Sequence, residues 1–174
     1  MKIVLLGSIP KGDDIREKWT DWKDEYIEKI AKHIPDVEFI HGDSVSDNAG
    51  AEMVVGHDLA QVKKADICVV DARSKIGAGT AQEIVIAKQF EKPVVIVIPK
   101  DTHHRKSGVT FHGVQMEEWI HPFLKVSADY VADSVDDAAL WITAFAKSPQ
   151  SYQIKDLSVF DRAIDLFEHS SASQ

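Results

Sequence analysis

The stretch of sequence that decides the fold runs from Ile67 to Ile98. It begins with the apolar run Ile67-Cys-Val-Val70 and ends with Pro93-Val-Val-Ile-Val-Ile98. Between the two lie the glycine-containing segment Gly77-Ala-Gly-Thr80 and a helical pattern over about Thr80–Phe90. Two continuous apolar runs that are joined by a helix are typical of parallel strands covered on both faces.

The same alternation continues on both sides of this stretch. We expect further strands at Ile3-Val-Leu-Leu6 and Val37-Glu-Phe-Ile40, and an edge strand at Asp129-Tyr-Val-Ala132. Apolar residues between the strands recur at helical spacing, which predicts helices at about Asp13–His33, Gly50–Lys64, Val135–Ala146 and Asp156–His169. The sequence therefore predicts an α/β fold, a flavodoxin- or Rossmann-like three-layer sandwich with a parallel sheet of about five strands.

The length of 174 residues favours one domain over two, and we place this domain at residues 1–169. Ser170–Gln174 is polar and is expected to be a disordered tail. The segment Lys100–Leu124 is polar and rich in histidine, and we predict a long ordered loop with a short helix. In a compact domain such a loop often serves in binding or at an interface.

The net charge of −8 argues against a general nucleic-acid binder, which would present a basic face. It leaves room for a small anionic ligand, because one phosphate needs only a few local donors. The single cysteine, Cys68, excludes an intramolecular disulfide and is expected to be buried and inert. The N-terminus does not resemble a signal peptide and no apolar stretch approaches membrane-spanning length. We therefore expect a soluble, cytoplasmic protein without a membrane partner.

Polar residues follow the predicted strands at their carboxyl ends. In open parallel sheets, ligands bind outside these ends, so the residues that follow different strands are expected to form one site. His41-Gly-Asp43 follows the second strand, and Pro99-Lys-Asp101 follows the fourth. The predicted substrate-binding residues follow the first and third strands: Gly7, Ser8, Ile9, Asp71, Gly77, Gly79 and Thr80.

Two acids near these residues are candidates for catalysis. Glu83 is predicted in the first turn of the helix that Gly77–Thr80 opens, where an acid also simply suits the helix dipole. Glycines there let a ligand approach the backbone, and the N–H groups at the helix start attract negative charge. Asp58 lies on the preceding predicted helix and is interpreted either as a solvated surface acid or as a partner of Glu83. Two carboxylates that meet in a cleft can divide the roles of acid and nucleophile.

Several other motifs are weaker. The segment Gly77–Thr80 is neither a Walker loop, since no Gly-Lys-Ser/Thr follows, nor a dinucleotide fingerprint, since the third glycine is missing. Ser8 suits a donor to a sugar or phosphate, and equally a turn or a helix cap. His103–Lys106 is interpreted as solvated loop charge rather than a metal site, because no third ligand stands at a diagnostic spacing. Trp119–Phe123 suits core packing or a dimer interface better than base stacking. Neither a metal nor a cofactor is predicted.

The residues around both acids resemble a known family. The runs are His57-Asp58-Leu-Ala-Gln-Val-Lys-Lys-Ala65-Asp66-Ile-Cys-Val-Val-Asp71 and Gly77-Ala-Gly-Thr-Ala-Gln-Glu83-Ile-Val-Ile-Ala87. Together with the opening Ile3–Ile9, they are similar to the nucleoside 2-deoxyribosyltransferase superfamily, which also contains 2′-deoxynucleoside 5′-phosphate N-hydrolases. The resemblance covers about residues 2–98. The pattern Gly77-x-Gly-Thr80-x-x-Glu83 also resembles the phosphoribohydrolases that release cytokinin bases, although two of their glycine-rich segments are missing here.

The resemblance implies that Glu83 is the nucleophile and that Asp58 assists departure of the base. A further aspartate of the transferases has no counterpart, since Gly77 stands at its spacing, and Asp71 is the candidate substitute. The implied reaction moves 2-deoxyribose between nucleobases through a covalent glycosyl-Glu83 intermediate. Hydrolysis of 2′-deoxynucleoside 5′-monophosphates is the alternative, and a non-catalytic nucleotide-binding module is the second.

The resemblance also implies the partners. These are a small-molecule nucleoside or nucleotide, a free nucleobase, and further copies of the chain in a homo-oligomer that completes the site. The candidate contact regions are the loop Asp101–Gly113 and the aromatic segment Trp119–Phe123.

Overall fold

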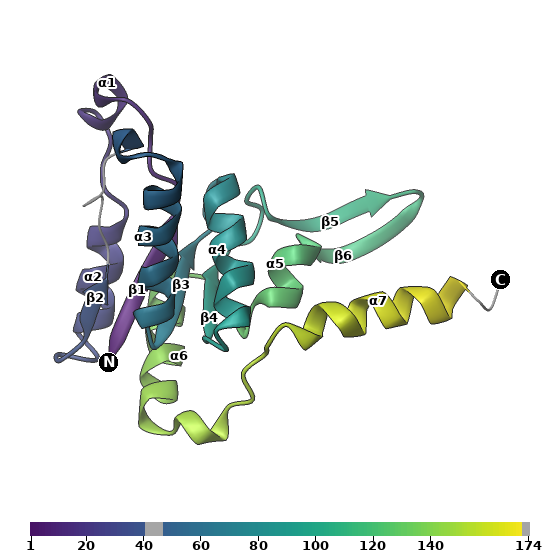
Figure 1. The fold of residues 1–174 in the computed structure, drawn as a ribbon. Helices are drawn as coiled ribbons and strands as arrows, with labels where there is room; N and C mark the ends of the chain where they lie inside the picture. Colours follow the sequence, from purple (N-terminus) through teal and green to yellow (C-terminus); the bar gives the residue numbers. More distant parts are fainter. Residues whose placement is uncertain (41–46, 172–174) are drawn as a thin grey trace.

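The computed structural model describes residues 1–40 and 47–171 (Figure 1). Its main sheet consists of β1 (Lys2–Gly7), β2 (Glu38–Ile40), β3 (Ile67–Asp71), β4 (Val94–Val97) and β7 (Tyr130–Ala132). The strand order is β2-β1-β3-β4-β7, and every neighbouring pair is parallel. The predicted parallel sheet of five strands is confirmed, and β7 lies at its edge as expected.

Helices cover both faces of this sheet. The helices α2 (Lys23–Ala31) and α6 (Val135–Lys147) pack on one face, whereas α3 (Ala51–Lys64), α4 (Ala78–Gln89) and α5 (Pro122–Ser127) pack on the other. Side chains of β1 alternate between the two layers: Ile3 and Leu5 join the first core, and Val4 and Leu6 join the second. Alternation along a strand therefore supplies both cores, and the predicted three-layer sandwich is confirmed.

The predicted helix over Asp13–His33 is wrong in its middle. Two helices form instead, α1 (Asp13–Arg16) and α2, and the residues between them leave the helical path. The carboxylate of Asp21 accepts a hydrogen bond of 3.0 Å from the N–H of Lys23, which restarts the chain as α2. The indole N–H of Trp22 donates to the carbonyl of Ser8 at 3.1 Å. Tertiary contacts thus override a helical spacing that runs through the break.

The predicted loop over Lys100–Leu124 is also wrong. Most of it is an antiparallel hairpin of β5 (Arg105–Phe111) and β6 (Val114–Ile120), which projects from the body of the molecule (Figure 1). His112 and Gly113 connect the strands with φ values of 49° and 81°, as a two-residue hairpin turn requires. At the base, the guanidinium of Arg105 donates to the carbonyl of Ile98 at 3.0 Å and pairs with Glu118 and Asp133.

The charge of this segment is only partly solvated, contrary to the prediction for His103–Lys106. His104 and Arg105 are 5% and 7% exposed, whereas His103 and Lys106 are exposed. Burial is the main cause that lowers the pKa of His104 to about 4. Its Nε2 atom accepts the backbone N–H of Ile76 at 3.2 Å. The ring is therefore a neutral structural group that ties the hairpin base to the loop before α4.

The remaining elements are two short 3-10 helices, at Asp47–Ala49 and Pro149–Ser151, and the last helix, α7 (Ser158–Ser171). Ser170 and Ser171, the first residues of the predicted tail, are the last residues of α7, and residues 172–174 lie outside the described residues. His41, Gly42 and Asp43 lie outside them as well. Within the ranges that the structure describes, no helix combines the length and apolar character needed to cross a membrane.

Candidate active site

The candidate site lies where the strand order reverses. Successive strands are added on opposite sides of β1, so the connections that leave β1 and β3 run to opposite faces and open a crevice at their carboxyl ends. Gly7 and Asp71, the last residues of these strands, are direct neighbours across the sheet. A cavity of about 640 Å³ opens here, lined mainly by the segment after β1, one side of α3 and the start of α4. This confirms that the polar residues after β1 and before α4 converge, as the sheet topology predicts.

Glu83 lies at the wall of this cavity, in the second turn of α4 and not in the first. The helix dipole acts mainly on charges in the first turn. A favourable interaction with the dipole therefore does not explain why an acid stands at position 83. Burial of the carboxyl is the main cause that raises its pKa from 4.5 to about 7, and the negative charge of Asp58 raises it further. Both causes disfavour the ionised form.

Asp58 lines the same cavity from α3. Its side chain is 45% exposed, and its Oδ1 atom lies 3.0 Å from Nδ1 of His57. The side-chain amide of Gln61 lies 2.8 Å from Nε2 of the same imidazole. The cavity therefore brings the two predicted catalytic acids together and adds an imidazole beside one of them.

The predicted glycines at the start of α4 keep the mouth of the cavity open. Gly77 has a φ of −82°, which any residue adopts, so the backbone does not demand glycine there. A Cβ atom added to Gly77 or Gly79 meets nothing within 4 Å. Since both glycines line the cavity, side chains at these positions would extend into its opening. Thr80, which is buried, lines the cavity one residue further along α4.

The predicted residues after β1 have structural roles beside their place in the cavity. A Cβ atom on Gly7 would approach the ring of Trp22 to 2.5 Å, so close packing requires glycine there. The hydroxyl of Ser8 donates to the carbonyl of Lys75 at 2.9 Å, which joins this segment to the one before α4. Gly7, Ser8 and Ile9 all line the cavity.

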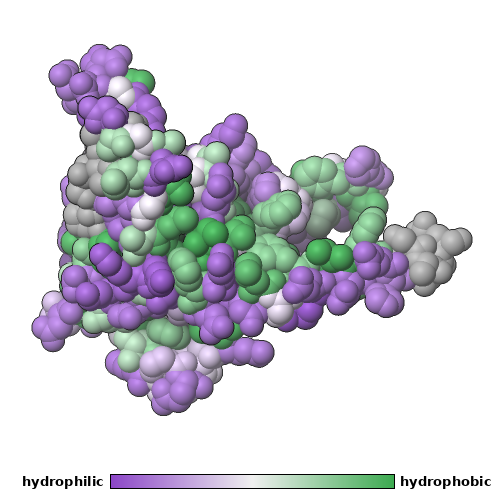
Figure 2. Space-filling model, viewed as in Figure 1, coloured by the Kyte–Doolittle hydropathy of each residue, from purple (hydrophilic) through white to green (hydrophobic). Residues whose placement is uncertain are grey.

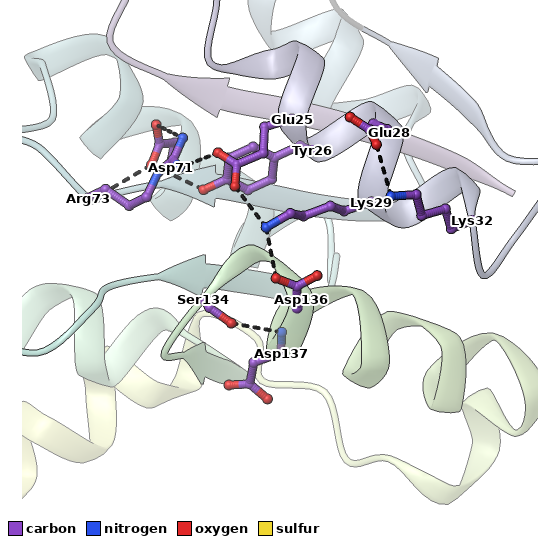
Figure 3. A network of polar contacts seen from close by, with 10 residues as sticks. All are labelled: Glu25, Tyr26, Glu28, Lys29, Lys32, Asp71, Arg73, Ser134, Asp136 and Asp137. Carbon is purple, nitrogen blue, oxygen red and sulfur yellow. Dashed lines mark hydrogen bonds and ion pairs between the residues drawn. The ribbon is translucent and has the colours of Figure 1, made fainter.

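Asp71 does not line the cavity that contains Glu83. It lies in a neighbouring cavity of about 490 Å³, with Trp19, Trp22 and Arg73, which shares Ser8 and Ile9 with the first. Its carboxylate accepts hydrogen bonds from the hydroxyl of Tyr26 at 3.1 Å and from Nε of Arg73 at 2.8 Å. Figure 3 shows how Arg73, Glu25 and Lys29 extend this network toward α6. The carboxylate is thus occupied by protein groups.

Three cations line the Glu83 cavity: Lys11, Arg16 and Lys23. Arg16 donates from Nε to the carbonyl of Pro10 at 3.0 Å, which fixes its side chain against the segment after β1. Lys23 is 6% exposed and pairs with Asp21 at 3.2 Å. Asp13 also lines the part of the cavity nearest α1, so that cations outnumber acids among its described lining residues, in contrast to the part that contains Glu83 and Asp58.

Sequence reasoning missed His57, Gln61 and Lys23 as cavity residues. A signal for the first two exists, because Val54, His57, Asp58 and Gln61 recur at the spacing of one helix face, and all four line the cavity. Lys23 follows the break between α1 and α2, which the sequence pattern did not reveal.

Cys68 is completely buried, as predicted, and burial raises its pKa to about 12, so the thiol is not a nucleophile. Across residues 1–40 and 47–171, no three His, Cys, Asp or Glu side chains gather in a way that could hold a metal ion. The described residues that line the Glu83 cavity present carboxyl, imidazole, amide and cationic groups.

Solved structures with a similar course of the chain include the CMP N-glycosidase BcmB of Clostridium botulinum and a 2-deoxyribosyltransferase of Bacillus psychrosaccharolyticus. The first is 12% identical, with a TM-score of 0.43 over 83% of this chain and 99% of that chain. The second is 17% identical, with a TM-score of 0.45 over 80% of this chain and 90% of that chain. At these identities the likeness concerns the fold alone.

No protein-family model matches the chain, and no curated protein matches it.

Proposed function

We propose that the protein cleaves the N-glycosidic bond of 2′-deoxynucleosides or their 5′-monophosphates, with Glu83 as the nucleophile. The meeting of Glu83 and Asp58 in one cavity carries this proposal, together with the raised pKa of Glu83. Pairs of carboxyl groups perform most glycoside cleavage. A carboxyl in a cleft whose pKa is shifted by burial and by a second charge is typical of a catalytic group.

In the proposed mechanism, the Glu83 carboxylate attacks the anomeric carbon while the bond from this carbon to the base breaks. The transition state resembles an oxocarbenium ion and leads to a glycosyl ester of Glu83. The departing base takes a proton from Asp58 in its protonated form, directly or through His57, whose ring nitrogen lies 3.0 Å from that carboxyl group. Acid catalysis of this kind contributes on the order of 10²–10⁴-fold.

Transfer of 2-deoxyribose to a second nucleobase is the first candidate for the overall reaction. The second base attacks the anomeric carbon of the ester, releases Glu83 and yields a new nucleoside with net retention. Two features support it: the cavity of about 640 Å³, within the usual range for small-molecule sites, and the mouth that Gly77 and Gly79 leave open. An open mouth permits one base to leave and another to enter while the sugar stays bound.

Hydrolysis of 2′-deoxynucleoside 5′-monophosphates is the second candidate, with water as the acceptor. The observation that favours it is the part of the cavity in which cations outnumber acids, to which Lys11, Arg16 and Lys23 contribute. A 5′-phosphate there forms charge-assisted hydrogen bonds, which are stronger than neutral ones. The sugar then lies between the phosphate and the two acids.

The deciding experiment incubates the protein with deoxyinosine or with 2′-deoxynucleoside 5′-monophosphates, each with and without a second free nucleobase, and separates the products by chromatography. Transfer gives a new nucleoside only when the acceptor base is present. Hydrolysis gives free base and sugar, or sugar phosphate, without it. Absence of both products from all substrates overturns the proposal in favour of a binding module.

The role of Glu83 is tested separately by acid quench and peptide mass spectrometry during turnover. The peptide that contains Glu83 is expected to gain the mass of one deoxyribosyl group when the substrate is a nucleoside. With a 5′-monophosphate as substrate, it is expected to gain the mass of one 5-phosphodeoxyribosyl group. The variant Glu83→Gln should lack the adduct, whereas Glu52→Gln should retain it, because Glu52 is an exposed acid of α3 outside the cavity. An adduct on another residue contradicts the assignment.

A further inference from the structure

The last helix has an apolar side that the body of the molecule covers only at its beginning. Val159 is 6% exposed and Phe160 is half-buried, but residues 161–170 are all exposed. With 3.6 residues per turn, Ala163, Ile164, Leu166 and Phe167 continue the side that Val159 and Phe160 begin. Ile164 is 55% exposed and Leu166 is 74% exposed. The apolar stripe thus runs on beyond the body.

The hairpin β5–β6 projects in the same direction as α7 (Figure 1). Its outer part also exposes apolar side chains, since Phe111 is 41% exposed, Val114 65% and Met116 38%. These side chains share one face, because Phe111 pairs with Val114 and Val109 with Met116. A two-stranded hairpin or a short helix alone is only marginally stable in water. The hairpin β5–β6 and helix α7, the two arms of the molecule, are therefore expected to be stabilised by contact with a partner surface.

A groove suited to such a helix lies between α4 and α5. It encloses about 720 Å³, and its walls are largely apolar: Ala78, Ala81 and Val85 of α4, and Phe123 and Leu124 of α5. Figure 2 shows apolar side chains gathered over this region and continuing toward the two arms. Among the described residues, none of α7 lines the groove. The chain thus has an apolar groove and an apolar side of α7, but the described residues of α7 do not line the groove of their own copy.

We propose that α7 of a second copy docks in this groove, and that the two copies exchange their last helices around a twofold axis. Docking of an amphipathic helix in an apolar groove is a common mode of recognition, and reciprocal exchange fills both grooves. Charge supports the match: α7 has Asp161, Asp165 and Glu168 beside its apolar side, whereas the described residues that line the groove include Lys75 and no acid. The acids of one copy then lie near Lys75 of the other.

The segment before α7 is fixed in a way that directs the helix outward. The backbone N–H of Lys155 donates to Asp129 at 2.8 Å, and its ammonium group donates to the carbonyl of Val126 at 3.0 Å and to that of Ala128. Buried Lys88 donates to the carbonyl of Lys155 at 3.2 Å and pairs with Asp129. Because the segment is held on both sides, α7 starts from a defined place, and none of its described residues lines the groove of its own copy.

The groove and the Glu83 cavity share Gly77 and Ala78 as a common wall. A docked helix would fix the start of α4, which sets the mouth of the cavity. If the proposed function is correct, dissociation of the two copies is expected to lower turnover. Association itself does not depend on that function.

The test measures molecular mass by sedimentation over a range of concentrations, without substrate. The protein of 19.4 kDa is expected to form a dimer, and Leu166→Asp is expected to weaken the dimer by at least about 100-fold, as loss of a buried anchor does at interfaces. Leu140→Asp is the matched control, because Leu140 is an exposed leucine of α6, 59% exposed and outside both arms and the groove. A monomeric protein, or a Leu166→Asp variant that stays dimeric, overturns the proposal.

Disulfide formation between introduced cysteines identifies the occupant of the groove. Cys68 is buried and does not interfere. Copies with Leu166→Cys are mixed with copies with Val85→Cys under mild oxidation, and a disulfide-linked dimer is expected only in the mixture. Its absence overturns the proposal, as does a cross-link that forms only within one chain when both cysteines are on the same copy. Both measurements are independent of activity, so failure of the proposed function leaves them valid.

Discussion

Two groups of acids lie at the carboxyl edge of the same sheet, and their surroundings differ in kind. Asp71 ends β3 and accepts hydrogen bonds from Tyr26 and Arg73, so its charge is matched by a cation and a hydroxyl (Figure 3). Glu83 is partly buried beside a second negative charge, and both circumstances raise its pKa. The first arrangement pairs the anion with a cation, whereas the second sets it beside another anion. Matched acids hold a structure together, whereas unmatched acids are available for chemistry.

The largest expected effect is on the activity of the unmatched acid. Glu83→Gln keeps the shape of the side chain but removes the proposed nucleophile, so turnover should fall by at least about 1000-fold. The measurement is steady-state product formation with the substrate that the wild type uses. Asp71→Asn should keep the rate within about 10-fold, because Asp71 lies outside the cavity. Equal losses for the two variants would remove the contrast between the two acids.

The same Glu83→Gln variant is expected to be more stable than the wild type at pH 8. Because the folded-state pKa of Glu83 is about 7, against an ordinary 4.5, the stability cost of ionising Glu83 builds up between pH 4.5 and pH 7 and is fully present at pH 8. One pKa unit corresponds to about 1.4 kcal/mol, so the gain at pH 8 amounts to roughly 2–3 kcal/mol. The gain should vanish below pH 4.5, where the carboxyl is protonated in both states. Urea unfolding at the two pH values checks the sign, and a gain that does not depend on pH contradicts this origin.

The matched acid should behave in the opposite way. Asp71→Asn leaves the Arg73 guanidinium and the Tyr26 hydroxyl without their anionic acceptor. The free energy of unfolding should therefore fall by about 1–3 kcal/mol, the usual cost of an unsatisfied buried polar group. Urea unfolding at pH 7 measures it, with Asp66→Asn at an exposed site as the comparison. A stability equal to that of the wild type would show that the network is not required.

The pH dependence of turnover gives the smallest and most specific effect. If ionised Glu83 is the nucleophile, kcat/KM falls about 10-fold for each pH unit below the pKa of about 7. If Glu83 instead donates a proton to the departing base, kcat/KM falls as pH rises above 7. A profile between pH 5 and pH 9 distinguishes the two roles. An inflection that persists in Glu83→Gln would belong to another group.

The sequence predicted best those elements in which apolar residues follow a regular pattern. Apolar runs such as Ile67–Val70 and Val94–Ile98 can only be buried strands, and their order along the chain determines which loops meet at the sheet edge. Glu83 and Asp58 follow from this topology together with the family resemblance. Asp71 follows the same rule, yet Arg73 and Tyr26 draw its side chain into a different cavity. The direction of a side chain depends on partners that lie far apart in the sequence.

The break between α1 and α2 and the hairpin β5–β6 could not be predicted because local patterns conflict with tertiary contacts. Ile15, Trp19, Trp22 and Tyr26 keep a helical spacing across a break that Trp22 and Ser8 stabilise from outside the segment. The hairpin turn His112–Gly113 is not one of the common asparagine–glycine pairs. Arg105, the charged residue that anchors the hairpin, is buried only because Ile98, Glu118 and Asp133 surround it.

The hairpin is inserted between β4 and β7, two strands that pair directly with each other, and Val97 lies opposite Ala132. Its root is held by Arg105, which contacts Ile98 on one side and Asp133 on the other, and by His104, which accepts the backbone N–H of Ile76. The sheet therefore keeps its register whatever lies beyond that root. For protein engineering, this makes the hairpin an exchangeable module: grafts of different length or affinity can be placed there while the main sheet remains unchanged.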